Sequence, residues 1–147
     1  MQDTYEYDII SDTWSTESSS LPRRIQHACI SIEGESNILV AGGYYNNNTE
    51  YWYSTSEIYD TESKIWSNGP NFPKGLHATS MVQASPNSKY VGYIFGGFPE
   101  AAKPVISMTD IFGVTKDLQN IVKLGDLQKG RMSHRAIKLP SRISDKC

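Results

Sequence analysis

Short apolar runs separated by turn-forming residues make up most of the chain. The clearest runs are residues 38–41 and 90–95, and each is followed by a pair of glycines. A continuous apolar run of this length between turn signals is typical of a strand buried on both faces. No stretch keeps a helical period over three turns, and residues 118–127 come nearest to one. The pattern predicts an all-β chain.

The expected strands are short and are separated by clusters of Gly, Pro, Asn, Asp and Ser. They occupy residues 3–8, 13–16, 27–32, 38–41, 56–59, 64–67, 78–84, 90–95, 106–112, 121–124 and 136–139. The Asn-rich stretch 44–55 carries five aromatic residues and is expected to be a loop.

One aromatic spacing occurs twice. Tyr7-Asp8 is followed after five residues by Trp14, and Tyr59-Asp60 is followed after five residues by Trp66, with both copies 52 residues apart. A period near 50 residues indicates a repeat array. Other landmarks recur in the same order, namely Pro22 and Pro73, His27-Ala28 and His77-Ala78, Gly42-Gly43 and Gly96-Gly97, with a further echo at 131–136.

This order of landmarks resembles the kelch repeat. Four short strands per repeat of about 50 residues form one blade of a β-propeller. The resemblance implies that the repeated aromatics and glycines are structural: Tyr7, Trp14, Gly42, Gly43, Tyr59, Trp66, Gly96 and Gly97. In the second repeat Phe112, Gly113 and Gln119 stand where Tyr, Asp and Trp are expected.

The resemblance divides the chain into repeat units. Residues 1–21 are the outer strands of a partial blade, 22–72 a full repeat, 73–127 a repeat with a degenerate outer strand, 128–140 the start of a further blade, and 141–147 a tail. A closed propeller typically needs four to eight blades. We therefore expect an incomplete propeller of about two to three four-stranded antiparallel blades. The remaining blades would come from a longer chain or from other copies, and the partial repeats favour a fragment.

Composition and charge narrow the function classes. The chain is 38% hydrophobic and 20% charged with a net charge of −2, which is an ordinary soluble composition and gives no general attraction to nucleic acid or to an anionic membrane. The first residues lack a signal peptide, so a cytoplasmic location is expected, or a secreted one if a preceding segment carries a signal. Of the two cysteines, Cys29 is expected to be a buried apolar residue, and Cys147 is terminal.

Motifs that would carry catalysis are absent from the sequence. It has no Ser-His-Asp spacing, no Cys-His pair and no phosphate-binding loop. We therefore expect no enzyme, no cofactor and no metal site. His27, His77 and His134 recur within the repeats, where structural hydrogen bonds are the expected role because blades spread such residues around an axis.

In kelch propellers, the loops before the first strand of each blade and after the glycine pair share one face, which generally binds partner proteins. Carried onto this chain, that face contains Arg23, Arg24, Lys74, Arg131, Arg135, Tyr44, Tyr45, Tyr51 and Trp52. A basic ring edged with aromatic residues would suit a protein partner presenting an acidic peptide.

The resemblance therefore implies a non-catalytic protein–protein interaction module. Such modules often serve as the substrate receptor of a ubiquitin-ligase adaptor. The alternative is part of a propeller enzyme or of an extracellular glycan-binding kelch-like protein.

Overall fold

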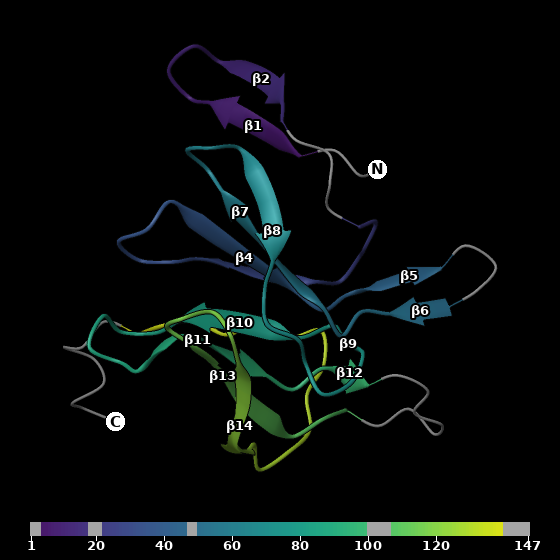
Figure 1. Cartoon of the computed structure of the whole chain (residues 1–147). Helices are drawn as coiled ribbons and strands as arrows, with labels where there is room; N and C mark the ends of the chain where they lie inside the picture. Colours follow the sequence, from purple (N-terminus) through teal and green to yellow (C-terminus); the bar gives the residue numbers. More distant parts are fainter. Residues whose placement is uncertain (1–3, 18–21, 47–49, 100–106, 140–147) are drawn as a thin grey trace.

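The computed structural model describes residues 4–17, 22–46, 50–99 and 107–139. All regular structure within these ranges is β-strand, in agreement with the all-β prediction. Two four-stranded antiparallel sheets and an N-terminal hairpin lie as successive layers (Figure 1). This arrangement confirms the expected incomplete, propeller-like fold.

Each four-stranded sheet is a meander that we call a blade. The first blade consists of β3 (Ala28–Ser31), β4 (Asn37–Ala41), β7 (Ser56–Asp60) and β8 (Ile65–Asn68). The second blade consists of β10 (Ser80–Gln83), β11 (Tyr90–Phe95), β13 (Asp110–Thr115) and β14 (Ile121–Asp126).

The N-terminal hairpin repeats the outer half of a blade. It consists of β1 (Tyr5–Asp8) and β2 (Thr13–Thr16), and it pairs Tyr7 with Trp14 as the first blade pairs Tyr59 with Trp66. The ring centroids of both aromatic pairs are 4.9 Å apart. Asp8 and Asp60 accept backbone N–H groups of the following turns, so the turns are equivalent as well.

Two short pairings join the loops near the glycine pairs. β5 (Tyr44–Asn46) and β6 (Glu50–Trp52) form a hairpin between β4 and β7, and β9 (Leu76–His77) pairs with β12 (Phe98–Pro99). All four strands lie at the same end of the blades, on the right of Figure 1. We call this end the corner face and the opposite end, with the tight hairpin turns, the turn face.

The main core lies between the two blades. Leu39 and Ile58 of the first blade are buried together with Ile94 and Val114 of the second. The approach is close, because a Cβ atom on Gly92 of β11 would overlap the Cδ1 atom of Ile30. Burial of apolar surface here stabilises the molecule by roughly 25 cal/mol per Å² removed from water.

The register of the second blade differs from the sequence comparison by two residues. Val40 and Ile94 each stand two residues before a glycine pair, so they occupy one repeat position. Val40 pairs with Glu57, and Ile94 pairs with Phe112. Phe112 therefore corresponds to Glu57, and not to Tyr59 as the sequence suggested.

The outer strand of the second blade is complete. Val114 pairs with Ile121 as Tyr59 pairs with Trp66, so an aliphatic pair replaces the aromatic one. Val114 is fully buried and Ile121 packs against the core. Phe112, Gly113 and Gln119, which made the outer strand look degenerate in the sequence, therefore do not occupy the repeat positions of Tyr59, Asp60 and Trp66.

The three histidines do not share one repeat position. Gln26, Ala78 and Ser133 all have positive φ, and the N–H of Ala78 donates to the Gln26 carbonyl as the N–H of Ser133 donates to the Ala78 carbonyl. His77 precedes this position, whereas His27 and His134 follow it. This corrects the correspondence drawn from the sequence.

Residues 128–139 form no strand in the described structure, although a strand was expected over 136–139. The segment still follows β10, because the Ala136 N–H donates to Ser80 Oγ at 2.6 Å and Lys138 Nζ donates to the Ala84 carbonyl at 3.2 Å. It therefore runs where the inner strand of a further blade would begin.

Candidate partner-binding face

Four aromatic rings connect the two blades across the corner face. Tyr44 lies 5.6 Å from Trp52 and 5.3 Å from His77, and His77 lies 5.2 Å from Phe98, measured between ring centroids. We call Tyr44, Trp52, His77 and Phe98 the aromatic ladder. All four residues are half-buried, so the ladder is both a packing element and an accessible surface.

Glycines set the position of the ladder. Gly42 and Gly43 have φ values of +64° and +106°, a region that residues with a Cβ rarely adopt. The Gly43 N–H donates to the Leu76 carbonyl at 2.8 Å, and a side chain on Gly42 would overlap that carbonyl. The β5–β6 hairpin is thereby fixed on the segment that leads into the second blade. Gly75 permits the same approach, because a Cβ there would lie 2.6 Å from the Trp52 Cβ.

His77 is the titratable member of the ladder. Burial lowers the pKa of its imidazole below the ordinary value of 6.5. Its Nδ1 atom is buried without a hydrogen-bond partner. The ring is therefore neutral at pH 7 and packs as an aromatic group.

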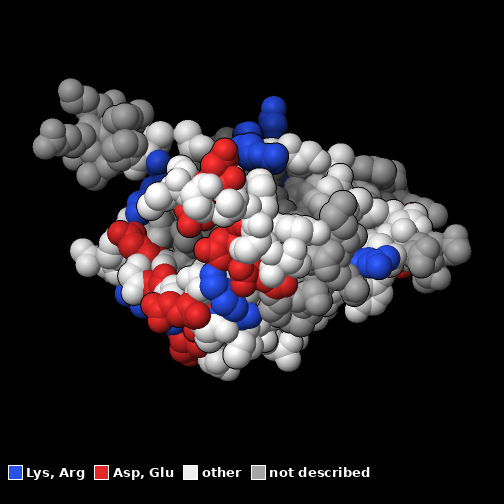
Figure 2. All heavy atoms as spheres, turned by 90° about the horizontal axis from the view of Figure 1, so that it is seen from above, with Lys and Arg blue, Asp and Glu red and all other residues white. Residues whose placement is uncertain are grey.

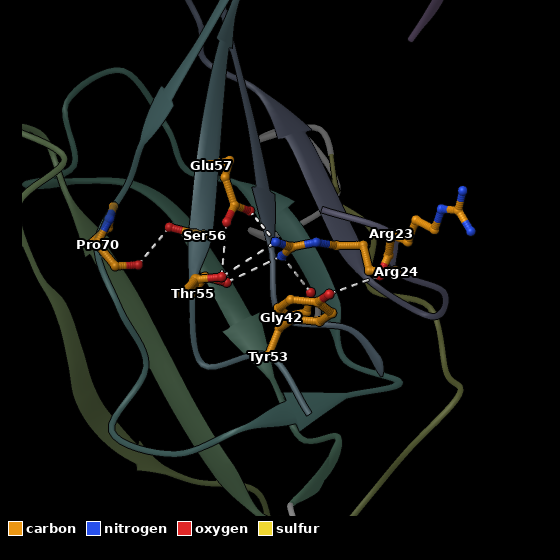
Figure 3. Close-up of polar contacts among 8 residues, drawn as sticks. All are labelled: Arg23, Arg24, Gly42, Tyr53, Thr55, Ser56, Glu57 and Pro70. Carbon is orange, nitrogen blue, oxygen red and sulfur yellow. Dashed lines mark hydrogen bonds and ion pairs between the residues drawn. The ribbon is translucent and has the colours of Figure 1, made fainter. Parts of the chain in front are cut away.

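Arg24 was expected at the surface, but its side chain is fully buried (Figure 3). Its guanidinium lies 2.5 Å from the Glu57 carboxylate and donates to the Gly42 carbonyl at 2.8 Å. It also stacks on the Tyr53 ring, 4.3 Å from the centroid. Thr55 Oγ1 donates to the other oxygen of Glu57 at 2.9 Å. Arg24 is thus occupied by groups of its own blade.

The second blade has apolar side chains at these two positions. Leu76 and Arg24 each stand two residues before the positive-φ position, and Phe112 corresponds to Glu57. Leu76 and Phe112 both belong to the hydrophobic core. A buried ion pair in one blade is therefore replaced by hydrocarbon in the next.

The other predicted cations are exposed: Arg23, Lys74, Arg131 and Arg135. Arg23 points away from the Arg24–Glu57 pair in Figure 3, and its carbonyl accepts the Tyr53 hydroxyl at 3.0 Å. Arg131 occupies the repeat position of Arg24, whereas Lys74 lies two residues earlier in its repeat. The predicted cations therefore do not all occupy the same position of the repeat.

The predicted aromatic residues of the corner face all lie on the β5–β6 hairpin. Tyr44 and Trp52 belong to the ladder, Tyr45 is half-buried, and Tyr51 is exposed. Tyr51 makes an edge-to-face contact with Tyr53, with the ring centroids 4.7 Å apart. The hairpin therefore combines internal packing with an outward aromatic surface.

The inner strands of the two blades border a pocket of about 280 Å³. His27, Cys29, Thr79 and Arg135 contribute to its lining. Cys29 was expected to be buried but is exposed, because its side chain alternates away from the core side of β3. Burial and the nearby charge of Arg24 lower the pKa of His27.

Charge is distributed unevenly between the two ends of the blades. Seen from above the N-terminal hairpin, acidic side chains gather toward the side with the hairpin turns (Figure 2). Acidic residues of the turn face are Asp8, Asp12, Glu33, Glu35, Glu62 and Asp117. The corner face carries the exposed cations Arg23, Lys74, Arg131 and Arg135 together with the exposed Glu50, whereas Lys89 and Lys116 lie among the acidic residues of the turn face. An acidic ligand would therefore be attracted to the corner face.

Two kinds of feature are absent from the described ranges. Within them, no three His, Cys, Asp or Glu side chains are arranged to hold a metal ion. None of the described residues forms a helix with the length and hydropathy needed to cross a bilayer.

Glu57 and His77 contribute to the structure of the candidate face in ways that the sequence did not reveal. Glu57 stands directly before the apolar residues Ile58 and Tyr59 in β7, which is the one sequence signal of a buried partner. The spacing of His27 and His77 was a second signal, because it is 50 residues while the aromatic landmarks are 52 apart.

No protein-family model matches the chain, and no curated protein matches it by sequence. The fold is similar to the solved structure of YjhT, with a TM-score of 0.71 and 16% sequence identity. The match covers 89% of this chain and 47% of that chain, so this chain spans about half the length of YjhT. The likeness concerns the fold alone and supports a β-propeller-like architecture.

Proposed function

We propose that the chain is part of a kelch-repeat β-propeller that binds a partner protein, without catalysis, through its corner face. The observation that carries this proposal is the aromatic ladder, which joins two blades at the end where the exposed cations lie. Aromatic residues and Arg are the usual anchors of protein interfaces.

The proposed partner segment is an acidic peptide. Arg23, Lys74 and Arg131 flank the ladder and have no acidic partner among the described residues. Arg24 is left out, because its charge is already balanced by Glu57. A role as the substrate receptor of a ubiquitin-ligase adaptor is compatible with such a peptide-binding face.

The test uses selection from a random peptide library displayed on phage, with the whole chain immobilised. We expect enrichment of peptides that combine Asp or Glu with an aromatic residue. A triple variant with Arg23→Ala, Lys74→Ala and Arg131→Ala should weaken binding of the selected peptides at least tenfold. Binding of wild type should also weaken as salt rises, because surface charges are screened.

The matched control replaces cations at the turn face, Lys89→Ala and Lys116→Ala. Both side chains are exposed. Lys89 lies over the Tyr90 ring, and Lys116 donates to the Pro86 carbonyl. Peptide binding should be unchanged in this variant. Selection of peptides without acidic residues, or equal losses in both variants, would contradict the proposal.

A further inference from the structure

The N-terminal hairpin presents an uncovered copy of a surface that is covered elsewhere in the chain. Tyr7 and Trp14 are 42% and 70% exposed, whereas the corresponding Tyr59 is only 5% exposed. The two aromatic pairs have the same centroid distance and interplanar angles of 38° and 39°. The aromatic pair therefore has the same geometry whether or not another sheet covers it.

The internal copy shows what covers such a pair. The Tyr59–Trp66 pair faces the hairpin across a cavity of about 300 Å³, whose lining includes Thr4 and Glu6. Trp66 Nε1 donates to Thr4 Oγ1 at 3.2 Å, and Lys64 forms an ion pair with Glu6. In this fold, the aromatic pair of one sheet thus faces the sheet that comes before it in the chain.

A complementary uncovered face lies at the other end of the chain. Val122 and Leu124 of β14 are 41% and 42% exposed, on the side of the second blade that faces away from the first. Leu124 and Tyr90 close over Gly113, because a Cβ on Gly113 would lie within 2.9 Å of each side chain. On the equivalent face of the first blade, Leu39 and Ile58 are covered by the second blade.

The two uncovered faces belong together in the repeat. Tyr7 and Trp14 correspond to Val114 and Ile121, which pack on the outward face of the first blade. A further hairpin docked on the second blade would place its aromatic pair over Gly113, next to Val122 and Leu124. Since each chain carries one face of each kind, the contact is head to tail.

We propose that two copies of this chain join head to tail into one propeller ring. Tyr7 and Trp14 of each copy cover Val122 and Leu124 of the other. The fold match supports a ring of two, because one copy aligns with 47% of YjhT. This inference goes beyond the proposed peptide-binding face and does not depend on it.

The test measures molar mass by sedimentation equilibrium over a range of concentrations, with the melting transition as a check on folding. Wild type should reach about 33 kDa, twice the monomer mass of 16.5 kDa. Trp14→Asp and Val122→Asp should each remain monomeric, because every contact in the ring needs both faces. The control Ile10→Asp changes a 98% exposed residue in the same hairpin and should associate as wild type does.

Mixing the two monomeric variants separates this arrangement from any other dimer. A mixture of Trp14→Asp and Val122→Asp retains one intact contact in the ring and should form dimers more weakly than wild type. A face-to-face dimer would give no such recovery. A wild-type monomer at all concentrations, a dimer that persists in either single variant, or a mixture that stays monomeric would overturn the proposal.

Discussion

Arg24 and Glu57 place two opposite charges where the second blade has hydrocarbon. Removing one partner of a buried ion pair leaves an uncompensated charge, whereas replacing both by apolar groups is often neutral. The contacts of Arg24 with Gly42 and Tyr53 offset part of its desolvation cost. The pair is therefore expected to be sensitive to single changes and tolerant of paired ones.

Arg24→Ala should lower the free energy of unfolding by about 3–5 kcal/mol. The double variant Arg24→Leu with Glu57→Phe copies the second blade and should lose less than the single variant. Urea denaturation measures both. The adjacent Arg23→Ala is the control and should stay within about 0.5 kcal/mol of wild type. A loss in the double variant equal to the sum of the losses measured for Arg24→Leu and Glu57→Phe alone would contradict this view of the pair.

Gly42 and Gly34 separate backbone strain from steric overlap. Both have positive φ, but an added Cβ on Gly34 meets nothing within 4 Å, whereas one on Gly42 overlaps the Leu76 carbonyl. Gly34→Ala should cost roughly 1–2 kcal/mol from the left-handed conformation alone. Gly42→Ala should lower the free energy of unfolding by clearly more, because the backbone at Gly42 or at Leu76 has to move to make room for the Cβ atom. Thermal melts of both variants test this, and equal losses would contradict it.

At the level of elements, the β5–β6 hairpin and the β9–β12 pair are each too small to be stable alone. Their stability comes from the aromatic ladder and from the backbone contacts at Gly43 and Gly75. His77 stands at the centre of the ladder and is the only titratable ring in it near neutral pH. Protonation of His77 is therefore expected to weaken the packing between the β5–β6 hairpin and the β9–β12 pair.

Stability should fall as the pH drops from 7 toward 5, in part because of His77. Burial lowers the pKa of its imidazole in the folded chain, so the unfolded chain takes up a proton first, near its ordinary value of 6.5. The stabilisation is fully present above that value and is lost as the pH falls toward the folded pKa. His77→Phe keeps a ring in the ladder and should flatten the dependence of the melting temperature on pH over this window.

The control for this measurement is His77→Asn, which also removes the titration but loses the ring. It should flatten the pH dependence while lowering the melting temperature at every pH. An unchanged slope in both variants would assign the pH dependence to His27 and His134, whose pKa values are also lowered by burial.

The sequence predicted the elements better than their register. The apolar runs and turn residues located the strands of the N-terminal hairpin and of both blades, because these strands are short and bounded by turn-forming residues. They missed β9 and β12, and they missed the β5–β6 hairpin, which lies in the stretch 44–55 that was expected to be a loop. The register of the second blade was misplaced because Phe112 resembles the tyrosine of the repeat chemically. The burial of Arg24 could not be predicted, because its partner Glu57 is distant in sequence and only the fold brings them together.

At the scale of the whole molecule, the two blades are one unit because they share a core. Ile30 of the first blade and Gly92 of the second meet there, since a Cβ atom on Gly92 would lie 2.3 Å from Ile30 Cδ1. Small changes on either side should therefore affect the other.

Gly92→Ala should destabilise the chain by about 1–3 kcal/mol through overpacking against Ile30. Ile30→Val removes the methyl group that would overlap and should cost about 0.5–1.5 kcal/mol alone. The double variant should lose less than the sum of the two, as measured by urea denaturation. Strict additivity would mean that the blades do not meet at this point.

The exchange of Arg24 and Glu57 for Leu76 and Phe112 also limits how such repeats can be inherited. A recombination breakpoint between positions 24 and 57 would join an arginine to a phenylalanine, or a leucine to a glutamate, and leave one buried charge without its partner. A breakpoint outside that interval would keep both members of the ion pair, or both members of the apolar pair, together. Blades of this kind are therefore expected to be exchanged as whole repeats, so that the residue at position 24 or 76 is inherited together with its partner at position 57 or 112.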